Sequence, residues 1–301
     1  MPQAKANGIT IEYESFGRES DPAILLIMGF AAQMILWPTK MCEDLAARGF
    51  RVIRFDNRDI GKSTHLSQLG AANPMEAMMK RMSGQPVTAP YALDDMAQDA
   101  ASLLDALGIK RAHIVGASMG GMIAQLVAAK HPGHTLSLTS IMSTTGRADL
   151  PPGKPEAMAA LSTPPASGSR EDRIAAGMRV ATALASPGFP TSEADMRRDV
   201  EAAVDRVPFD PDGVARQLLA IVAAPARNDL LKTVKAPTQV IHGADDPILT
   251  IEGGKDTADS IPGAKLHVIP GMAHDFAAGL VPIYVKLIGD FAQSVEKAKA
   301  A

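Results

Sequence analysis

The sequence predicts an α/β protein with a mostly parallel central sheet, helices on both faces and a helical cap insertion. Three observations support this fold class. Short β-branched runs alternate with helical segments through most of the 301 residues, which is typical of βαβ units. Several runs are apolar throughout, as expected for strands buried on both faces. Between residues 143 and 236 the strand pattern stops and helical segments follow.

The predicted strands are short, and helical segments separate them. Residues 9–13 alternate between apolar and polar side chains like an edge strand, whereas residues 23–28 are continuously apolar. The helical segment at residues 96–107 ends before Gly108, a common stop signal. The other five predicted strands are residues 51–55, 112–115, 136–142, 238–242 and 265–269.

The insertion divides the chain into two predicted parts. Residues 1–142 and 237–301 form the sheet-based core domain, and residues 143–236 form a helical cap domain. The stretch at residues 151–169 is rich in proline, glycine and serine, so we expect a loop there. Three helices are predicted after it, at residues 171–185, 192–207 and 211–224.

Composition excludes several classes of partner. The chain is 46% hydrophobic and 21% charged, with a net charge of -3 and no basic run, so we expect no nucleic acid partner. Residues 23–32 form the longest apolar run, which is too short to cross a bilayer, and the N-terminus lacks the apolar segment of a signal peptide. We therefore expect no membrane contact and a cytoplasmic location. Many folds of this class are monomers or dimers, so we expect a monomer or homodimer. The single cysteine, Cys42, allows no intrachain disulfide and is expected to be buried.

Four methionines form a stripe at helical spacing. Met75, Met78, Met79 and Met82 fall at positions i, i+3, i+4 and i+7. This spacing predicts an amphipathic helix that packs on the core. The alternative is a flexible wall for an apolar ligand.

One serine lies between two glycines where a predicted strand becomes a helix. The motif Gly116-x-Ser118-x-Gly120 in this context is typical of a nucleophile elbow. The turn is so tight that side chains beside the serine would collide with the backbone. It presents Ser118 near a helix N-terminus, where developing negative charge is stabilised. Ser118 is therefore the candidate nucleophile, and an inert serine in a glycine-rich turn is the alternative.

A serine nucleophile needs a base, and histidine is the usual one. His274 follows the last predicted strand in a glycine-containing loop, at the edge of the sheet where sites gather. It is the best candidate of the seven histidines. The other six lie in predicted strands or in surface turns and loops: His65, His113, His131, His134, His242 and His267.

The base needs an acid that orients it, between the serine and the histidine in chain order. Asp245 and Asp246 follow the strand at residues 238–242. Their chemistry is the same, so either one could be the acid. Asp56 comes too early in the chain. Asp275 adjoins His274, so its side chain should point elsewhere.

Two backbone N–H groups should form an oxyanion hole. One comes from the residue after the nucleophile, Met119, and the other from the loop Met28-Gly29-Phe30, where we assign Phe30. This chemistry uses neither a metal nor a cofactor.

Taken together, these motifs resemble the α/β-hydrolase family over nearly the whole chain. In chain order they are IMGF, FDNRDIGKST, GASMGG, IHGADDP and PGMAH. The resemblance implies the α/β-hydrolase fold with a helical cap. It also selects Asp246, the third residue after Gly243, as the acid. It implies structural roles for Asp56, Arg58, Gly61 and Ser63.

The segments LLIMGF, LWP and DNRDIGKST most resemble the subgroup that contains aclacinomycin methylesterase. This resemblance implies a serine carboxylesterase for bulky, largely apolar esters, acting through Ser118, His274 and Asp246. Many family members carry His-Gly at the oxyanion loop, whereas this chain carries Met28-Gly29. The backbone donor is retained, but hydrogen bonds from that histidine are lost.

The same three residues serve other reactions, which stay open. These are lactone opening, C–C bond hydrolysis, amide or aminopeptidase cleavage, perhydrolysis, and hydrolysis of macrolide or anthracycline esters. Epoxide hydrolases and haloalkane dehalogenases are disfavoured, because their elbow nucleophile is aspartate. A non-catalytic ligand-binding protein on the same fold is a further alternative, which the absence of multiple turnover would reveal.

Overall fold

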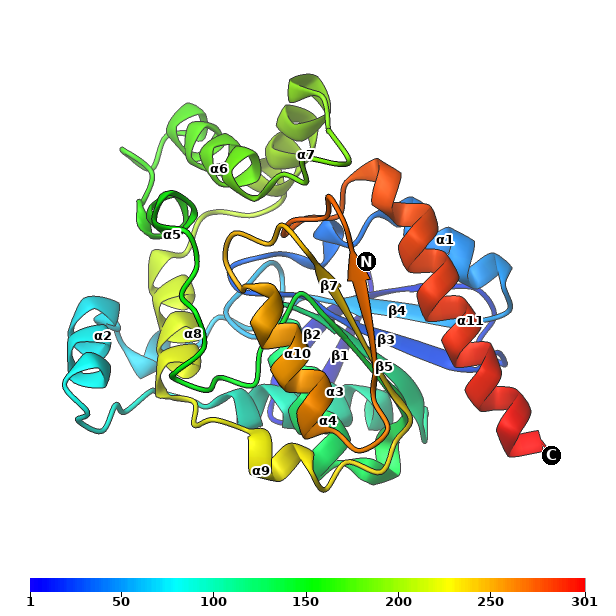
Figure 1. The fold of residues 1–301 in the computed structure, drawn as a ribbon. Coiled ribbons are helices and arrows are strands. Elements are labelled where there is room, and N and C mark those ends of the chain that lie inside the picture. Colours follow the sequence, from blue (N-terminus) through cyan, green and yellow to red (C-terminus); the bar gives the residue numbers. More distant parts are fainter. Residues whose placement is uncertain (301) are drawn as a thin grey trace.

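The computed structural model describes residues 1–300, which form one eight-stranded sheet covered by helices (Figure 1). The strand order is β1-β2-β4-β3-β5-β6-β7-β8. β1 pairs antiparallel with β2, β2 pairs antiparallel with β4, and every other neighbouring pair is parallel. The strands are β1 Gln3–Ala6, β2 Ile9–Phe16, β3 Ala23–Ile27, β4 Arg51–Phe55, β5 Ala112–Ala117, β6 Thr135–Ile141, β7 Thr238–Gly243 and β8 Lys265–Ile269.

All seven predicted strands are confirmed. The sheet also contains an eighth strand, β1, which was not predicted and which changes the position of β2. Residues 9–13 were expected at the edge of the sheet, but β1 lies outside β2 and forms the edge. Asn7 and Gly8 join the two strands with positive φ angles of 48° and 78°. An Asn-Gly pair is a strong hairpin signal, so the pairing of β1 with β2 could have been predicted from the sequence.

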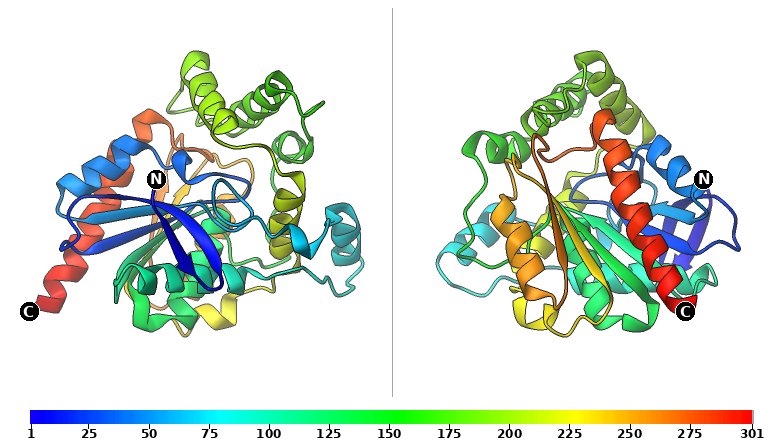
Figure 2. Two further views of the ribbon diagram at one scale, coloured as in Figure 1. Left: turned by 180° about the vertical axis from the view of Figure 1, so that it is seen from behind. Right: turned by 45° about the vertical axis from the view of Figure 1, so that its right-hand side comes forward.

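Helices cover both faces of the sheet (Figure 2). α1 (Thr39–Ala47) and α11 (Val281–Ala300) lie on one face, and their core includes Cys42, which is buried as predicted. α3 (Leu93–Ala106) and α4 (Met119–Lys130) pack on the other face, with α10 (Ile251–Ser260) beside them. Among the helices of residues 1–300, none is long and apolar enough to cross a membrane.

The segment between β6 and β7 contains five helices and, within the described residues, no strand. In Figure 1, α5, α6 and α7 lie above the sheet, α8 lies at its side, and α9 lies below beside α10. The expected loop at residues 151–169 is wrong, because α5 forms there with Pro155 at its first position, which suits a helix start. The helices are α5 Pro155–Ser162, α6 Arg170–Leu184, α7 Glu193–Arg206, α8 Pro211–Ala223 and α9 Asn228–Leu231. The division into a core and a cap at these boundaries stays a prediction.

The methionine stripe does form a helix, α2 (Pro74–Met82), but its expected packing on the core is wrong. The four methionines are between 42% and 87% exposed, and Ala77 is the residue that α2 buries. α2 packs against α8 and projects from the body of the molecule (Figure 1). The stripe faces away because the neighbour of α2 is α8 and not the sheet.

His113 links stability to pH. It is buried in β5, its Nδ1 lies 2.8 Å from Ser137 Oγ, and its Nε2 lies 3.3 Å from Glu296 Oε1. Burial lowers its pKa to about 4, although Glu296 opposes the shift. The unfolded chain therefore takes up this proton first. The resulting stability is present above about pH 6.5 and is lost as pH falls to about 4, by up to about 3 kcal/mol.

We expect the His113→Asn variant to lose less stability than the wild type when both are moved from pH 7 to pH 4. Urea unfolding at the two pH values measures this difference. An equal loss in the two proteins would contradict the assignment to His113.

Candidate active site

Ser118 occupies a sharp turn between β5 and α4, with φ 56° and ψ -122°. A Cβ added to Gly116 would lie 2.0 Å from the carbonyl oxygen of Gly120, and one added to Gly120 would lie 2.0 Å from that of Ile27. Both positions therefore require glycine. Of the residues from 112 to 128, Ser118 is the one that is not fully buried, so the turn presents its side chain at an accessible position.

The neighbouring backbone holds this strained conformation in place. Ser118 donates its N–H to Ile141 O at 2.9 Å, and its carbonyl accepts from the hydroxyl of Ser143 at 2.8 Å and from the N–H of Gly121 at 2.9 Å. A non-glycine residue at positive φ costs about 1–3 kcal/mol and persists where the surroundings enforce it. Such strain at an accessible serine is typical of a functional site.

Replacing Gly120 with alanine should destabilise the protein by about 3 kcal/mol or more, because the new Cβ meets the backbone of β3. We expect Tm to fall by about 5 °C or more, measured by circular dichroism. The matched control is Gly133→Ala, since a Cβ at Gly133 meets nothing within 4 Å. Equal melting temperatures for the Gly120→Ala variant and the wild type would contradict the packing argument.

The structure brings His274 and Asp246 together at the carboxyl edge of the sheet. Nδ1 of His274 lies 2.7 Å from Oδ2 of Asp246, whose side chain is fully buried. The other oxygen, Oδ1, accepts from the backbone N–H groups of Ile248 and Leu249, both at 2.9 Å. A carboxylate only accepts hydrogen bonds, so this contact favours the tautomer of the neutral imidazole that has its proton on Nδ1 and its lone pair on Nε2. Nε2 is the nitrogen that a base needs.

Asp245 has a different use. Its side chain is exposed at the surface, and Oδ2 accepts from the N–H of Gly271 at 2.9 Å, which joins the loop after β7 to the loop after β8. The residues alone did not decide whether Asp245 or Asp246 is the acid. The geometry places Asp246, as the family resemblance implies, beside the imidazole.

Sequence reasoning missed a second histidine at the acid. His242 is buried at the end of β7, with Nε2 2.7 Å from Leu249 O and 3.5 Å from Asp246 Oδ2. Burial lowers its pKa, so it is neutral near pH 7. The neutral ring can donate from Nε2 to Leu249 O. This contact stabilises the turn at Ile248 and Leu249, whose N–H groups bind Asp246. Its position four residues before Asp246 was the available signal.

The expected oxyanion loop lies against the nucleophile. A Cβ added to Gly29 would lie 3.1 Å from Ser118 Cβ and 3.6 Å from its Oγ, so only glycine fits without displacement. Within residues 1–300, the N–H groups of Phe30 and Met119 donate to no acceptor in the protein, and Met119 is the first residue of α4. Their assignment to an oxyanion hole stays a prediction.

The hydroxyl of Ser118 makes no hydrogen bond to the described residues, including His274. Catalytic hydrogen bonds often tighten only when substrate is bound. The structure therefore shows the pair of His274 and Asp246 and the elbow of Ser118, and the complete triad stays a prediction.

The C-terminal end of α6 and the residues after it hold the loop that carries His274. The N–H of His274 donates to Leu184 O at 3.1 Å, and the N–H of Ala273 donates to Ser186 Oγ at 2.8 Å. Asp275 accepts from the N–H and hydroxyl of Ser186, so it points away from the imidazole as expected. Nothing in the local sequence indicated these contacts, because they join segments about 90 residues apart.

The residues after β4 have structural contacts, as the resemblance implies. Asp56 is fully buried and accepts from the N–H groups of Met34 and Lys62 at 2.8 and 2.9 Å. Its Oδ2 also lies 2.7 Å from Nη1 of Arg206, at the end of α7. This buried ion pair joins α7 to the loop after β4.

Asp59, His65 and Asp210 lie close enough together to hold a metal ion by distance alone. However, both oxygens of Asp59 accept from Arg216, at 2.9 and 2.8 Å, and Arg216 also lies 3.6 Å from Asp210. The guanidinium supplies the positive charge that an ion would bring. These residues therefore give no argument for a metal.

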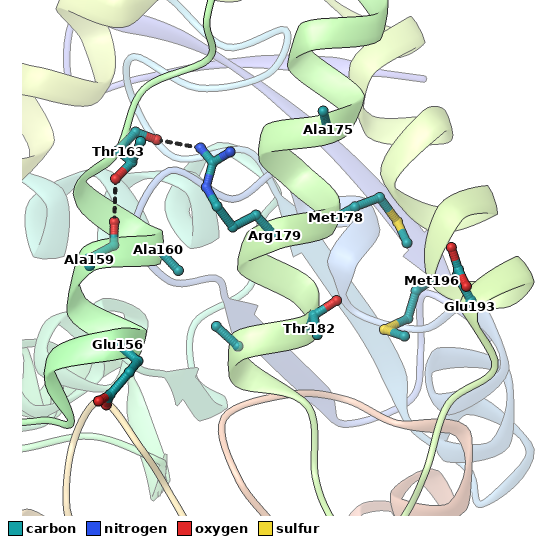
Figure 3. Close-up of a pocket in the computed structure, with 11 residues that line it drawn as sticks. Glu156, Ala159, Ala160, Thr163, Ala175, Met178, Arg179, Thr182, Glu193 and Met196 are labelled. Carbon is teal, nitrogen blue, oxygen red and sulfur yellow. Dashed lines mark hydrogen bonds between the residues drawn. The ribbon is translucent and has the colours of Figure 1, made fainter.

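A cavity of about 760 Å³ lies between α5, α6 and α7 (Figure 3). None of Ser118, Asp246 and His274 lines it. Its wall includes Ala183, the neighbour of the residue whose carbonyl accepts from His274. The cavity is mostly apolar, and it is lined by Glu156, Ala159, Ala160, Thr163, Ala175, Met178, Arg179, Thr182, Ala183, Glu193 and Met196.

The parallel sheet, the serine elbow and the paired acid and histidine at one edge define a protein of the hydrolase class. The chain belongs to the alpha/beta hydrolase fold family, whose model matches residues 22–277. This result confirms the predicted fold class and family.

Individual proteins agree with this assignment. The chain is 29% identical to rhodomycin D methylesterase DauP of Streptomyces sp. (strain C5), over 88% of this chain and 89% of that protein. The enol-lactonase from Burkholderia xenovorans LB400 has a similar structure, with a TM-score of 0.71, 23% identity and coverage of 97% and 100% of the two chains. The meta-cleavage product hydrolase CumD from Pseudomonas fluorescens IP01 gives a TM-score of 0.74 at 18% identity, over 98% of each chain. The fold and the relatives together support a hydrolase.

Proposed function

We propose that the protein is a serine carboxylesterase in which Ser118, His274 and Asp246 form a catalytic triad. The observation that carries the proposal is the contact of 2.7 Å between Asp246 and His274 at the same edge of the sheet as the Ser118 elbow. The methylesterase named among the relatives supports an ester as the substrate.

In the proposed reaction, Ser118 Oγ attacks the ester carbonyl while His274 Nε2 takes the hydroxyl proton. Asp246 holds the imidazole in the required tautomer and stabilises the imidazolium. The N–H groups of Phe30 and Met119 stabilise the oxyanion. The intermediate expels the alcohol, which takes its proton from His274. Water then attacks the acyl-enzyme by the same route and releases the acid.

We further propose a bulky and largely apolar substrate, bound by a monomer or homodimer. The cap is the source of this proposal, because its helices contribute a mostly apolar cavity of about 760 Å³ and also contact the loop of His274. Apolar side chains on these helices suit a substrate that is itself largely apolar.

Hydrolysis of p-nitrophenyl esters from acetate to laurate tests the proposal. We expect multiple turnover, with a higher kcat/KM for longer acyl chains. Binding without release of p-nitrophenol, or release of a single equivalent, would contradict an esterase and favour a ligand-binding protein.

A further inference from the structure

Ala31 directly follows the proposed oxyanion donor Phe30 and has an unusual backbone conformation. Its φ angle is 55°, in the left-handed region that alanine seldom adopts. Its N–H donates to Oε1 of Gln217 at 3.0 Å. Gln217 belongs to α8, 186 residues further along the chain. A side chain of the predicted cap therefore holds the oxyanion loop at a strained position.

The amide of Gln217 has one defined orientation. The side chain is fully buried, and its Nε2 donates to the carbonyl of Arg58 at 2.8 Å while its Oε1 accepts from Ala31. If the amide were reversed, its NH₂ group would face the N–H of Ala31 and its oxygen would face the carbonyl of Arg58, and neither pair could form a hydrogen bond. Because both ends are engaged, Gln217 connects the oxyanion loop to the loop after β4.

Other contacts hold the ends of the oxyanion loop. Asn57 donates from Nδ2 to the carbonyl of Met28 at 2.8 Å, and Asp56 accepts from the N–H of Met34 at the same distance. Both come from the loop after β4. Gln217 holds the middle of the loop, at the residue next to Phe30, the proposed oxyanion donor.

We infer that Gln217 is a positioning residue that holds the N–H of Phe30 in place for the oxyanion, an inference that rests on the proposed function. Peptide planes are rigid, so the bond to Ala31 restricts rotation on the C-terminal side of Phe30. Without it, Ala31 is free to relax to negative φ, and the relaxation displaces the plane of the neighbouring peptide. A displaced donor stabilises the transition state less than an aligned one. Docking of α8 thereby governs the oxyanion hole.

The test compares the wild type with Gln217→Met and Gln217→Leu, which remove the amide and put an apolar side chain of similar size in its place. The matched control is Gln239→Leu, because Gln239 is also buried and donates to Thr139 Oγ1 and Leu287 O away from the site. For p-nitrophenyl butyrate we expect kcat to fall about tenfold to hundredfold in both Gln217 variants, less than the loss of a whole donor. KM should stay within about threefold. The control should keep its kcat.

Inhibitor binding separates positioning from general loosening. Butylboronic acid forms a tetrahedral adduct with an active serine, whereas butyrate resembles the product. We expect the Ki of butylboronic acid to rise by the same factor as kcat falls, and the Ki of butyrate to stay unchanged. Equal changes for the two inhibitors, or an equal loss of kcat in the Gln239→Leu control, would overturn the inference.

Amide hydrogen exchange of the peptide at residues 28–37 gives a readout that needs no activity. It should exchange faster in the Gln217 variants than in the wild type and the control. Unchanged exchange would overturn the positioning role even if no ester were hydrolysed. Lack of turnover by the wild type would contradict the proposed function alone, so the two failures are distinguishable.

Discussion

The Ser118→Ala variant should lose at least about a thousandfold in kcat/KM for p-nitrophenyl butyrate while it remains folded. The serine is the proposed attacking group, and alanine keeps the Cβ that the turn already accommodates at φ 56°. Among residues 112–128, Ser118 is the one residue with a hydroxyl and the one at an accessible position. Residual rate would come from binding and from the oxyanion hole.

A fluorophosphonate label and the melting temperature complete this test. The wild type should take up one label per chain, and the Ser118→Ala variant none, with Tm within about 2 °C for this conservative change. Ser102→Ala is the matched control, because Ser102 lies on α3 and accepts a hydrogen bond from Gln98. Ester turnover that survives in the Ser118→Ala variant would refute the serine mechanism.

The second large effect should appear at Asp246. We expect Asp246→Asn to lower kcat by about a thousandfold to ten-thousandfold. An amide can present its NH₂ to His274 and stabilise the wrong tautomer, and it lacks the charge that stabilises the imidazolium. Asp246 is buried and its other oxygen accepts from two backbone N–H groups, so an amide oxygen would take that place and leave the NH₂ facing His274.

Asp245→Asn provides a control one residue away. Its side chain is exposed and accepts from Gly271, which an amide oxygen can also do, so kcat should stay within about threefold. Steady-state kinetics of the two variants measure the difference. If Asp245→Asn lost as much activity as Asp246→Asn, or if Asp246→Asn kept its activity, the proposed acid would be wrong.

Local patterns predicted the elements that depend on local physics. The apolar run of β3 and the glycines around Ser118 could be identified, because burial on both faces and a sterically crowded turn each restrict the residues allowed at successive positions. The Asn7-Gly8 hairpin carried a similar signal that was overlooked. The methionines of α2 show the limit of such reasoning, since helical spacing identifies an apolar face and does not name its neighbour.

The acid required more than local information. Asp245 and Asp246 are adjacent and both follow β7, so chemistry and chain order could not separate them, and the family resemblance was needed. The structure shows the physical difference. Asp246 turns inward to the N–H groups of Ile248 and Leu249, whereas Asp245 turns outward to Gly271.

By itself, the sequence determined the alternation of strands and helices, the elbow at Ser118 and the order of the candidate residues, because each follows from side chains near one another in the chain. The tertiary structure alone decided how the helices between β6 and β7 contact the candidate site. Gln217 meets Ala31 across 186 residues, and Ser186 meets Asp275 across 89. Such contacts depend on the positions of α6 and α8. Those positions result from the packing of the whole chain, so they cannot be predicted from any short stretch of residues.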